Sequence, residues 1–232
     1  YEVVVYDLML FGSAGLPSDP RLRVVEGDIR DTQRYASCLQ GVSHVIHMAC
    51  ISNDPSFELD PALSKTINYG CFEPLVRASK AAGVERFLFV SSSSVYGVSD
   101  APEVTEEHPL VPLTDYNKYK GLCEPILLRY QSSDFTTTVV RPATVCGYSP
   151  RMRFDLTVNI LTNHAITNRL IKVFGGQQKR PNIHIDDMTD LYLASLEWPD
   201  ATVDGQIYNA GYHNQRVMEH VKDDLYAQLF AQ

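Results

Sequence analysis

The chain has 232 residues, of which 44% are hydrophobic and 21% are charged, and its formal net charge is −8. This composition supports a packed core and excludes a wholly disordered chain, and a negative charge without a basic patch argues against nucleic acid as a partner. No apolar run is long enough to span a bilayer, no signal peptide opens the chain, and the five cysteines form no C-x-x-C or other metal-ligating spacing. We therefore expect a cytoplasmic protein with reduced thiols, no metal site and no membrane partner.

Short β-branched runs alternate with helical patterns through residue 147. Strands are predicted over residues 2–7, 21–28, 43–49, 86–92 and 135–143, and helices over 31–41, 61–83 and 113–131. The strand runs are continuously apolar rather than alternating, which is typical of strands buried on both faces. This order predicts an α/β fold with a Rossmann-type, doubly wound parallel sheet that is covered by helices on both faces. His44 and His47 alternate along one strand, and we expect them in the core or directly behind a site.

The pattern loosens beyond residue 147. Helices are predicted over residues 153–166 and 185–198, and short strands over 170–176 and 205–211. No linker rich in Pro, Gly or Ser separates this part from the rest, so we expect a smaller lobe that is interleaved with the sheet. The predicted division is a nucleotide-binding domain over residues 1–147 and a mainly substrate-binding lobe over residues 148–232.

Four consecutive serines, Ser91 to Ser94, follow the apolar run of residues 86–90. Parallel strands present their working residues at their carboxyl ends, so these hydroxyls are expected at the functional edge of the sheet. Tyr116 and Lys120 are four residues apart in a predicted helix and therefore share one face. A nearby ammonium favours the phenolate, and a serine hydroxyl can hold a substrate oxygen during proton transfer. The three groups predict proton transfer at an alcohol or ketone, which is the chemistry that accompanies hydride transfer to a nicotinamide.

Several motifs occur in the order found in one known family. They are "VVVYD", "VEGDIRD", "HVIHMAC", "SSSSVYG", "YNKYK", "RPATVCGYSPR" and "RPNIHIDD". In these motifs the chain resembles the extended short-chain dehydrogenases/reductases of the nucleotide-sugar epimerase/dehydratase family, and within it the UDP-glucose 4-epimerases. The resemblance runs from the first residue to about residue 213. It implies NAD as cofactor, a nucleotide sugar as substrate and a homodimer.

The resemblance also implies roles for individual residues. Counting back from Gly97 of "VYG" makes Ser92 the catalytic serine, with Tyr116 as the proton acceptor or donor and Lys120 as the residue that tunes it. The cofactor-binding residues that it implies are Asp7, Asp28, Ile29, Met48, Ala49, Cys50, Asn68, Tyr116, Lys120, Pro142 and Val145. The substrate-binding residues that it implies are Ser93, Ser94, Thr144, Lys172, Val173, Phe174 and Arg180. An acid at position 7 favours NAD over NADP, because it would repel a 2′-phosphate.

The sequence departs from the family at its beginning. The family opens with a strand and a G-x-x-G-x-x-G fingerprint that cradles the pyrophosphate, whereas this sequence starts at what corresponds to the second strand. The first strand would lie between strands 2–7 and 43–49, so we expect the printed sequence to lack its first βα unit. Pro125 falls inside the predicted helix that carries Tyr116, where it forfeits one backbone hydrogen bond.

The positions after Ser92 bear on the reaction. The resemblance places an Asp-Glu pair there in 4,6-dehydratases, whereas this sequence has Ser93 and Ser94, which cannot perform carboxylate acid/base chemistry. We therefore predict an NAD-dependent epimerase that works through a transient 4-keto intermediate. The alternative is an NAD(P)H-dependent nucleotide-sugar reductase or dehydrogenase, since the same residues serve both. A catalytically inactive cofactor-binding scaffold is a third reading, against which the intact Ser92, Tyr116 and Lys120 argue.

Overall fold

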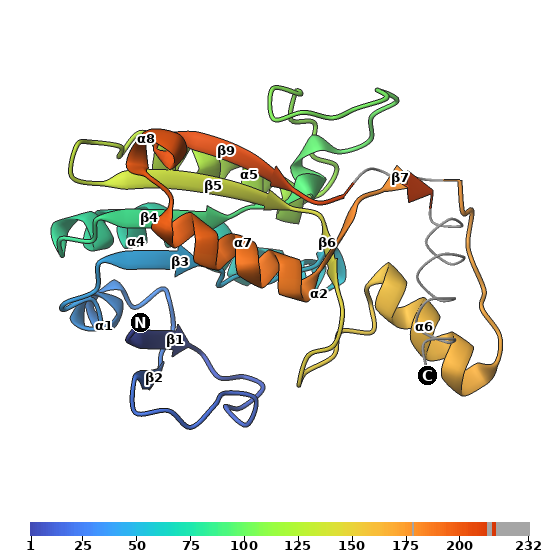
Figure 1. Ribbon diagram of the computed structural model, residues 1–232, viewed down its shortest axis with the longest axis horizontal. Helices are drawn as coiled ribbons and strands as arrows, with labels where there is room; N and C mark the ends of the chain where they lie inside the picture. Colours follow the sequence, from blue (N-terminus) through green and yellow to red (C-terminus); the bar gives the residue numbers. More distant parts are fainter. Residues whose placement is uncertain (178, 213–214, 217–232) are drawn as a thin grey trace. The chain divides into compact units, whose positions relative to one another are not determined.

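The computed structural model describes residues 1–177, 179–212 and 215–216. The chain divides into two compact units (Figure 1). The first unit comprises Tyr1–Arg141 and Ser195–Tyr208, and the second comprises Pro142–Ala194 with the described residues from Asn209 onward.

The secondary structure alternates strands and helices through most of the chain. The strands are β1 (Val3–Asp7), β2 (Leu22–Glu26), β3 (His44–His47), β4 (Arg86–Val90), β5 (Thr136–Pro142), β6 (Thr144–Cys146), β7 (Lys179–Arg180), β8 (Asn182–His184), β9 (Gln206–Ala210) and β10 (Gln215–Arg216). The helices are α1 (Thr32–Ser37), α2 (Asp54–Leu59), α3 (Pro61–Lys65), α4 (Phe72–Ala81), α5 (Asp115–Leu128), α6 (Thr157–Asn168), α7 (Ile185–Glu197) and α8 (Asp200–Val203). A π-helical turn spans Thr66–Gly70, and a 3₁₀ turn spans Ser93–Tyr96.

Two sheets belong to the predicted Rossmann-type region. Strands β3, β4, β5 and β9 form one sheet in that order, and β3, β4 and β5 are parallel. Strands β1 and β2 form a separate parallel pair, in which Val3 lies opposite Leu22 and Asp7 opposite Glu26. The prediction of a parallel α/β fold is confirmed. Within the described residues no ladder joins β1 to β3, and this is where the family resemblance puts a further strand.

The core of the first unit lies between β4 and the helices α4 and α5, which pack side by side. Phe87 and Phe89 of β4 meet Phe72 and Leu75 of α4, and Leu127 of α5 joins the same buried cluster. Burying such side chains contributes about 1.5–3 kcal/mol each. This contact fixes α5 beside β4, and therefore fixes the distance between the serines that follow β4 and the residues at the start of α5.

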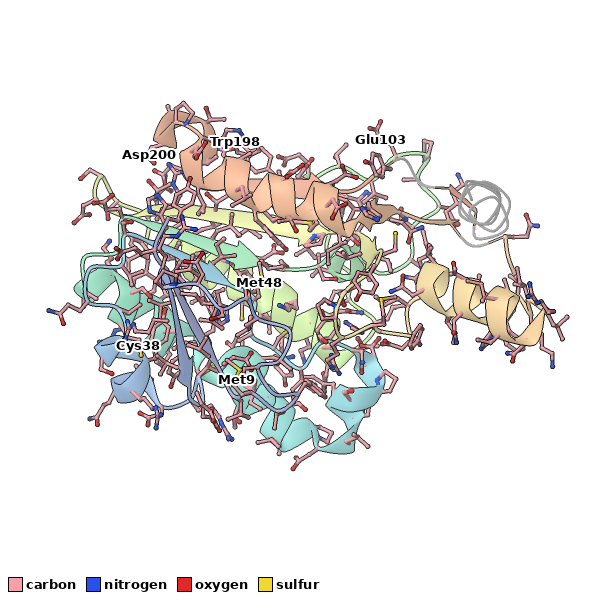
Figure 2. The ribbon with its side chains drawn as sticks, turned by 60° about the horizontal axis from the view of Figure 1, so that its bottom comes forward. Met9, Cys38, Met48, Glu103, Trp198 and Asp200 are labelled. Carbon is pink, nitrogen blue, oxygen red and sulfur yellow. The ribbon has the colours of Figure 1, made fainter. Side chains whose placement is uncertain are left out.

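A second set of contacts anchors β4 to the last turn of α7 and the residues that follow it. The guanidinium of Arg86, which is buried, donates to the main-chain oxygens of Ser195 and Trp198 and to the carboxylate of Asp200 at 2.6 Å. Figure 2 labels Trp198 and Asp200 in this region. Asp200 also accepts a hydrogen bond from the hydroxyl of Thr136 in β5, so one carboxylate bridges two neighbouring strands.

The prediction of one continuous helix over residues 61–83 is wrong. Helix α3 ends at Lys65, and the π-helical turn separates it from α4. The amide of Cys71 bonds to the carbonyl of Thr66 at 3.1 Å, five residues back, so the turn holds one extra residue. Helix α4 then ends before Gly83, whose φ of +81° is the left-handed conformation that favours glycine at a helix end.

Helix α5 runs through Pro125, as predicted. Proline carries no amide hydrogen, so the carbonyl of Gly121 gains no hydrogen bond from position 125. Tyr116 and Lys120 both lie in the turns before Pro125, where the helical hydrogen bonds do not involve the proline nitrogen.

The second unit contains α6, the parallel pair β6–β8 and the antiparallel pair β7–β10. The strand predicted over residues 170–176 is wrong, because no strand forms there. Ile171 and Val173 pack against Leu161 of α6 instead of pairing in a sheet. Gly175 and Gly176 have φ values of +78° and +90°, which are incompatible with an extended strand.

Candidate active site

The carboxyl end of β4 turns sharply into the serine run. Ser92 is extended, with φ −161° and ψ 143°, and its side chain caps the 3₁₀ turn that begins at Ser93. Gly97 closes this turn with a φ of +71°, and a side chain there would lie 2.0 Å from the main-chain oxygen of Val111. Glycine is therefore required at this position. The turn leaves Ser92, Ser93 and Ser94 half-buried at the carboxyl edge of the sheet.

Helix α5 brings Tyr116 and Lys120 to the same region. The helix begins at Asp115, and the hydroxyl of Thr114 accepts a hydrogen bond from the amide of Asn117. Tyr116 is half-buried, whereas Lys120 is buried with 3% exposed.

The ammonium of Lys120 is held at the end of β4. Its Nζ donates to the main-chain oxygen of Val90 at 2.7 Å and lies 5.0 Å from the centre of the Phe89 ring. Val90 is the last residue of β4, two positions before Ser92. A buried cation is therefore fixed next to the strand end that carries the serines, one helical turn from the phenol of Tyr116.

The hydroxyls of Ser92 and Ser94 are hydrogen-bonded to each other at 2.7 Å. Ser94 Oγ also donates to Oδ1 of Asn117, the residue directly after Tyr116. Sequence reasoning did not single out Asn117. Its only signal was its position inside "YNKYK", and the pairing with Ser94 arises from the packing of α5 against the serine turn.

A buried ion pair lies behind the serines, and sequence reasoning missed it as well. Arg141 of β5 donates to both carboxylate oxygens of Glu124, at 3.0 and 2.6 Å, and both side chains are 3% exposed. Ser91 Oγ donates to the same carboxylate at 2.6 Å, and Arg141 also donates to the hydroxyl of Tyr96. Glu124 is one helical turn beyond Lys120. Two successive turns of α5 are therefore hydrogen-bonded to the end of β4 and the serine run.

His47 lies beneath the end of β3 in an aromatic cluster. Its ring contacts the rings of Phe72, Phe87 and Phe89, with centroids 5.4 to 6.1 Å apart. Burial, together with the charge of Lys120, lowers the pKa of His47 from 6.5 to about 3. His47 is therefore neutral in the folded protein, and the prediction that it belongs to the core is confirmed.

The residues predicted to bind the cofactor in the first unit follow the ends of β1, β2 and β3. Asp7 is exposed at the end of β1, and its carboxylate accepts a hydrogen bond from the amide of Met9 at 2.7 Å. Asp28 follows β2, and the hydrogen-bonded guanidinium of Arg30 holds the pKa of its carboxyl below the ordinary value. Ile29 is buried, and Met48 is 48% exposed just beyond β3 (Figure 2).

Asn68 occupies a structural position in the π-helical turn. Its side chain accepts from the amide of Ile51 at 2.8 Å and donates to the carbonyl of Ile51 at 2.9 Å. This pair of bonds fixes the segment after β3 that contains the half-buried Ala49 and Cys50. Asn68 therefore stabilises the backbone of the segment in which Ala49 and Cys50 are predicted to bind the cofactor.

These residues fit the ribose-containing parts of NAD. The exposed carboxylate of Asp7 suits the two hydroxyls of a ribose, and Lys120 suits a ribose hydroxyl on the nicotinamide side. The printed sequence contains no G-x-x-G-x-x-G, the motif whose backbone amides cradle a pyrophosphate. None of the described residues forms a group of three or more His, Cys, Asp or Glu that could hold a metal ion.

The remaining predicted residues belong to the second unit. Thr144 and Val145 lie in β6 opposite Asn182 and Ile183 of β8. The other predicted residues are Pro142 at the end of β5, Arg180 in β7, the exposed Lys172 and Phe174, and Val173, which packs against α6. The structure does not test whether these residues meet a substrate, and their roles stay predictions.

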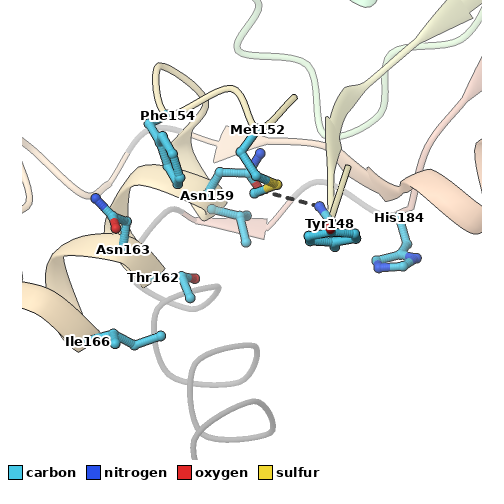
Figure 3. Close-up of a pocket in the computed structure, with 10 residues that line it drawn as sticks. Tyr148, Met152, Phe154, Asn159, Thr162, Asn163, Ile166 and His184 are labelled. Carbon is cyan, nitrogen blue, oxygen red and sulfur yellow. Dashed lines mark hydrogen bonds between the residues drawn. The ribbon is translucent and has the colours of Figure 1, made fainter. Parts of the chain in front are cut away.

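The second unit also contains a pocket of about 410 Å³ (Figure 3). Residues of α6, the segment after β6 and His184 line it, among them Tyr148, Met152, Phe154 and Asn159. None of the substrate residues predicted from the sequence lines this pocket. Gly147 has a φ of +117°, and a side chain there would come within 2.7 Å of His184, so glycine allows the close approach of β6 and β8 at this wall.

Comparison with known proteins gives a consistent result. Residues 5–211 match the family described as the NAD dependent epimerase/dehydratase family. A UDP-glucose 4-epimerase of Rhizobium meliloti is 32% identical over a stretch covering 85% of this chain and 65% of that protein. A 3 beta-hydroxysteroid dehydrogenase/Delta 5→4-isomerase of Mycobacterium tuberculosis is 28% identical over 83% of this chain and 54% of that protein.

Solved structures agree with the sequence comparison. The structure of MoeE5 in complex with UDP-glucuronic acid and NAD has a TM-score of 0.81 and 26% identity, covering 99% of this chain and 74% of MoeE5. The chain spans about half the length of the first curated relatives that it matches, 44% and 54% for two of them.

In the part of the chain that the structure describes, no helix has both the length and the apolar character needed to cross a membrane.

Proposed function

The chain belongs to the NAD dependent epimerase/dehydratase family, and on this premise we propose that it acts on a nucleotide-diphosphate sugar as an NAD-dependent epimerase. The proposed reaction passes through a transient 4-keto sugar. NAD, when bound, supplies the nicotinamide that takes up a hydride and returns it. The observation that carries the proposal is the buried Lys120 ammonium, which is hydrogen-bonded to Val90 O at the strand end bearing Ser92 and lies one turn from Tyr116.

The proposal assigns one role to each of these side chains. Tyr116 exchanges a proton with the sugar hydroxyl, and Lys120 stabilises the phenolate form of Tyr116 by its positive charge. Ser92 holds the sugar oxygen by a hydrogen bond. Asp7 binds the adenosine ribose. The nucleotide diphosphate is bound by Thr144, Lys172, Phe174 and Arg180, of which the arginine offers bidentate geometry to a phosphate.

The side chains after Ser92 favour the epimerase over the dehydratases of the same family. Ser93 and Ser94 carry hydroxyls where dehydratase chemistry requires ionisable groups for proton transfers at further sugar carbons. The second candidate is a dehydrogenase or reductase that releases its cofactor after one transfer, which the similarity to the mycobacterial dehydrogenase favours. A scaffold without activity is the least favoured candidate, because the three reactive side chains are all present.

The test is a turnover assay of the full chain with NAD and a panel of nucleotide sugars, beginning with UDP-glucose and UDP-glucuronic acid. An epimerase interconverts two sugars with no net change in absorbance at ~340 nm, whereas a dehydrogenase produces one NADH for each sugar oxidised. Tyr116→Phe should lower kcat at least ~100-fold and leave NAD affinity unchanged. Tyr130→Phe removes a phenol hydroxyl that bonds to Glu73 outside the site and serves as the matched control.

We also propose the homodimer that the family resemblance implies and the cytoplasmic location that the composition and the cysteines predict. Light scattering of the purified full-length protein tests the first, and fractionation of the source cells tests the second. A monomer at all protein concentrations, or recovery outside the cytoplasmic fraction, would contradict them.

A further inference from the structure

The hydroxyl of Ser92 is connected to the helix of Tyr116 by two consecutive hydrogen bonds. Ser92 Oγ lies 2.7 Å from Ser94 Oγ, and Ser94 Oγ lies 2.5 Å from Asn117 Oδ1. Asn117 is 7% exposed, so its carbonyl oxygen has little access to water and depends on a protein donor. The connection crosses from the serine turn to α5 between residues that are 23 positions apart in the sequence.

Counting hydrogens fixes the direction of this chain. The side-chain oxygen of Asn117 can only accept, so Ser94 donates its single hydroxyl hydrogen to it. Ser94 then has no hydrogen left for Ser92, and the bond between the two serines must use the hydroxyl hydrogen of Ser92. The amide of Ser94 also points to Ser92 Oγ at 3.2 Å and occupies one of its two lone pairs. The hydroxyl hydrogen of Ser92 therefore points to Ser94 Oγ.

Asn117 is itself held in place from the other side. Its main-chain amide donates to Thr114 Oγ1 at 3.4 Å, and the Thr114 hydroxyl donates to Asp54 Oδ1 at 2.6 Å. The first turn of α5 is therefore fixed against α2 as well as against the serines. The backbone of Asn117, whose side-chain oxygen accepts from Ser94, is therefore held in place.

We propose that Asn117, acting through Ser94, is a positioning residue that fixes the orientation of Ser92. The inference rests on the proposed function, because it concerns the serine that holds the sugar oxygen. Ser94 then supports Ser92, and of the two serines predicted to bind the substrate only Ser93 contacts the sugar.

Two pairs of matched variants of the full chain test this inference. Ser94→Thr keeps a hydroxyl at position 94, whereas Ser94→Val has the same shape without it. Asn117→Asp keeps an acceptor at position 117, whereas Asn117→Leu has a similar size without one. With NAD and UDP-glucose as the probe, kcat of Ser94→Val should be roughly tenfold below that of Ser94→Thr, which is the size of one neutral hydrogen bond. The dissociation constant of NAD should differ by less than ~2-fold within the pair, because position 94 is not among the residues predicted to bind the cofactor.

Crystal structures of the Ser94 pair supply a readout that does not depend on activity. Ser92 Oγ should keep its position in Ser94→Thr and rotate away in Ser94→Val, since the partner of its hydrogen is lost. Equal kcat values in the pair, or an unmoved Ser92 Oγ in Ser94→Val, would overturn the inference. If the wild-type protein turns over no nucleotide sugar while Ser92 Oγ still follows the hydroxyl at position 94, the positioning role stands and the proposed function fails.

Discussion

Replacing His47 by phenylalanine should make the protein less sensitive to acid. His47 is packed among three phenylalanine rings, and burial lowers its pKa from 6.5 to about 3. Between these two pH values the unfolded chain binds a proton at this position and the folded chain does not. The free energy of unfolding therefore falls as the pH is lowered through 6.5 toward 3. A phenylalanine ring cannot be protonated, so this contribution to the pH dependence disappears in the variant.

The magnitude follows from the two pKa values. From about pH 8 to about pH 5 the proton binding of unfolded His47 costs the folded state ~2 kcal/mol, by the linkage relation. The phenylalanine ring is larger than imidazole, and its effect on packing is the same at every pH, so the comparison uses only the change of the stability difference with pH. The carboxyl groups of Asp28 and Asp200, whose pKa values are lowered by arginine partners, add acid sensitivity to both proteins alike. They therefore cancel in the difference.

Urea denaturation of both proteins at several pH values between about 5 and 8 measures this effect. The gap between His47→Phe and the wild type should widen by ~2 kcal/mol in favour of the variant as the pH falls. His164→Phe, in helix α6 and outside the aromatic cluster, is the control and should follow the wild type. Equal acid sensitivity of the His47 variant and the wild type would refute the reasoning, as would an NMR titration of folded His47 with a midpoint near its ordinary value.

Three further changes probe the packing around the site. Glu124→Gln leaves the buried guanidinium of Arg141 without its carboxylate and should cost ~3–5 kcal/mol of unfolding free energy in urea, and a cost below ~1 kcal/mol would contradict the ion pair. Gly97→Ala forces a side chain into a left-handed position against a main-chain oxygen, so it should lower Tm by several degrees and reduce turnover, roughly as a ~2 kcal/mol loss. Asp200→Ala should cost only ~1 kcal/mol or less, because this carboxylate is 69% exposed and Arg86 keeps two carbonyl partners; a loss as large as that of Glu124→Gln would show that exposure does not govern these pairs.

The strands of the first unit could be predicted from the sequence, and so could the candidate residues Ser92, Tyr116 and Lys120. These features depend on information that is local in the chain. Continuous runs of β-branched residues predict buried parallel strands, and a spacing of four residues places Tyr116 and Lys120 on one helical face. The carboxylate of Asp31, a residue type that favours the N-cap, accepts from the amide of Arg34 at the start of the helix predicted over residues 31–41.

The side chains that support these candidate residues are brought together only by the packing of the folded chain. Asn117 finds Ser94, and Glu124 finds Arg141, across 23 and 17 positions of sequence, because α5 packs against β4 and β5. Patterns among neighbouring residues of the sequence do not indicate partners that are so far apart in the chain. The same holds for residues 170–176, which were predicted as a strand, whereas Ile171 and Val173 pack against α6. The hydrophobic effect is not directional, so an apolar side chain gains from burial against any apolar surface. The surface that buries it depends on how the whole chain packs.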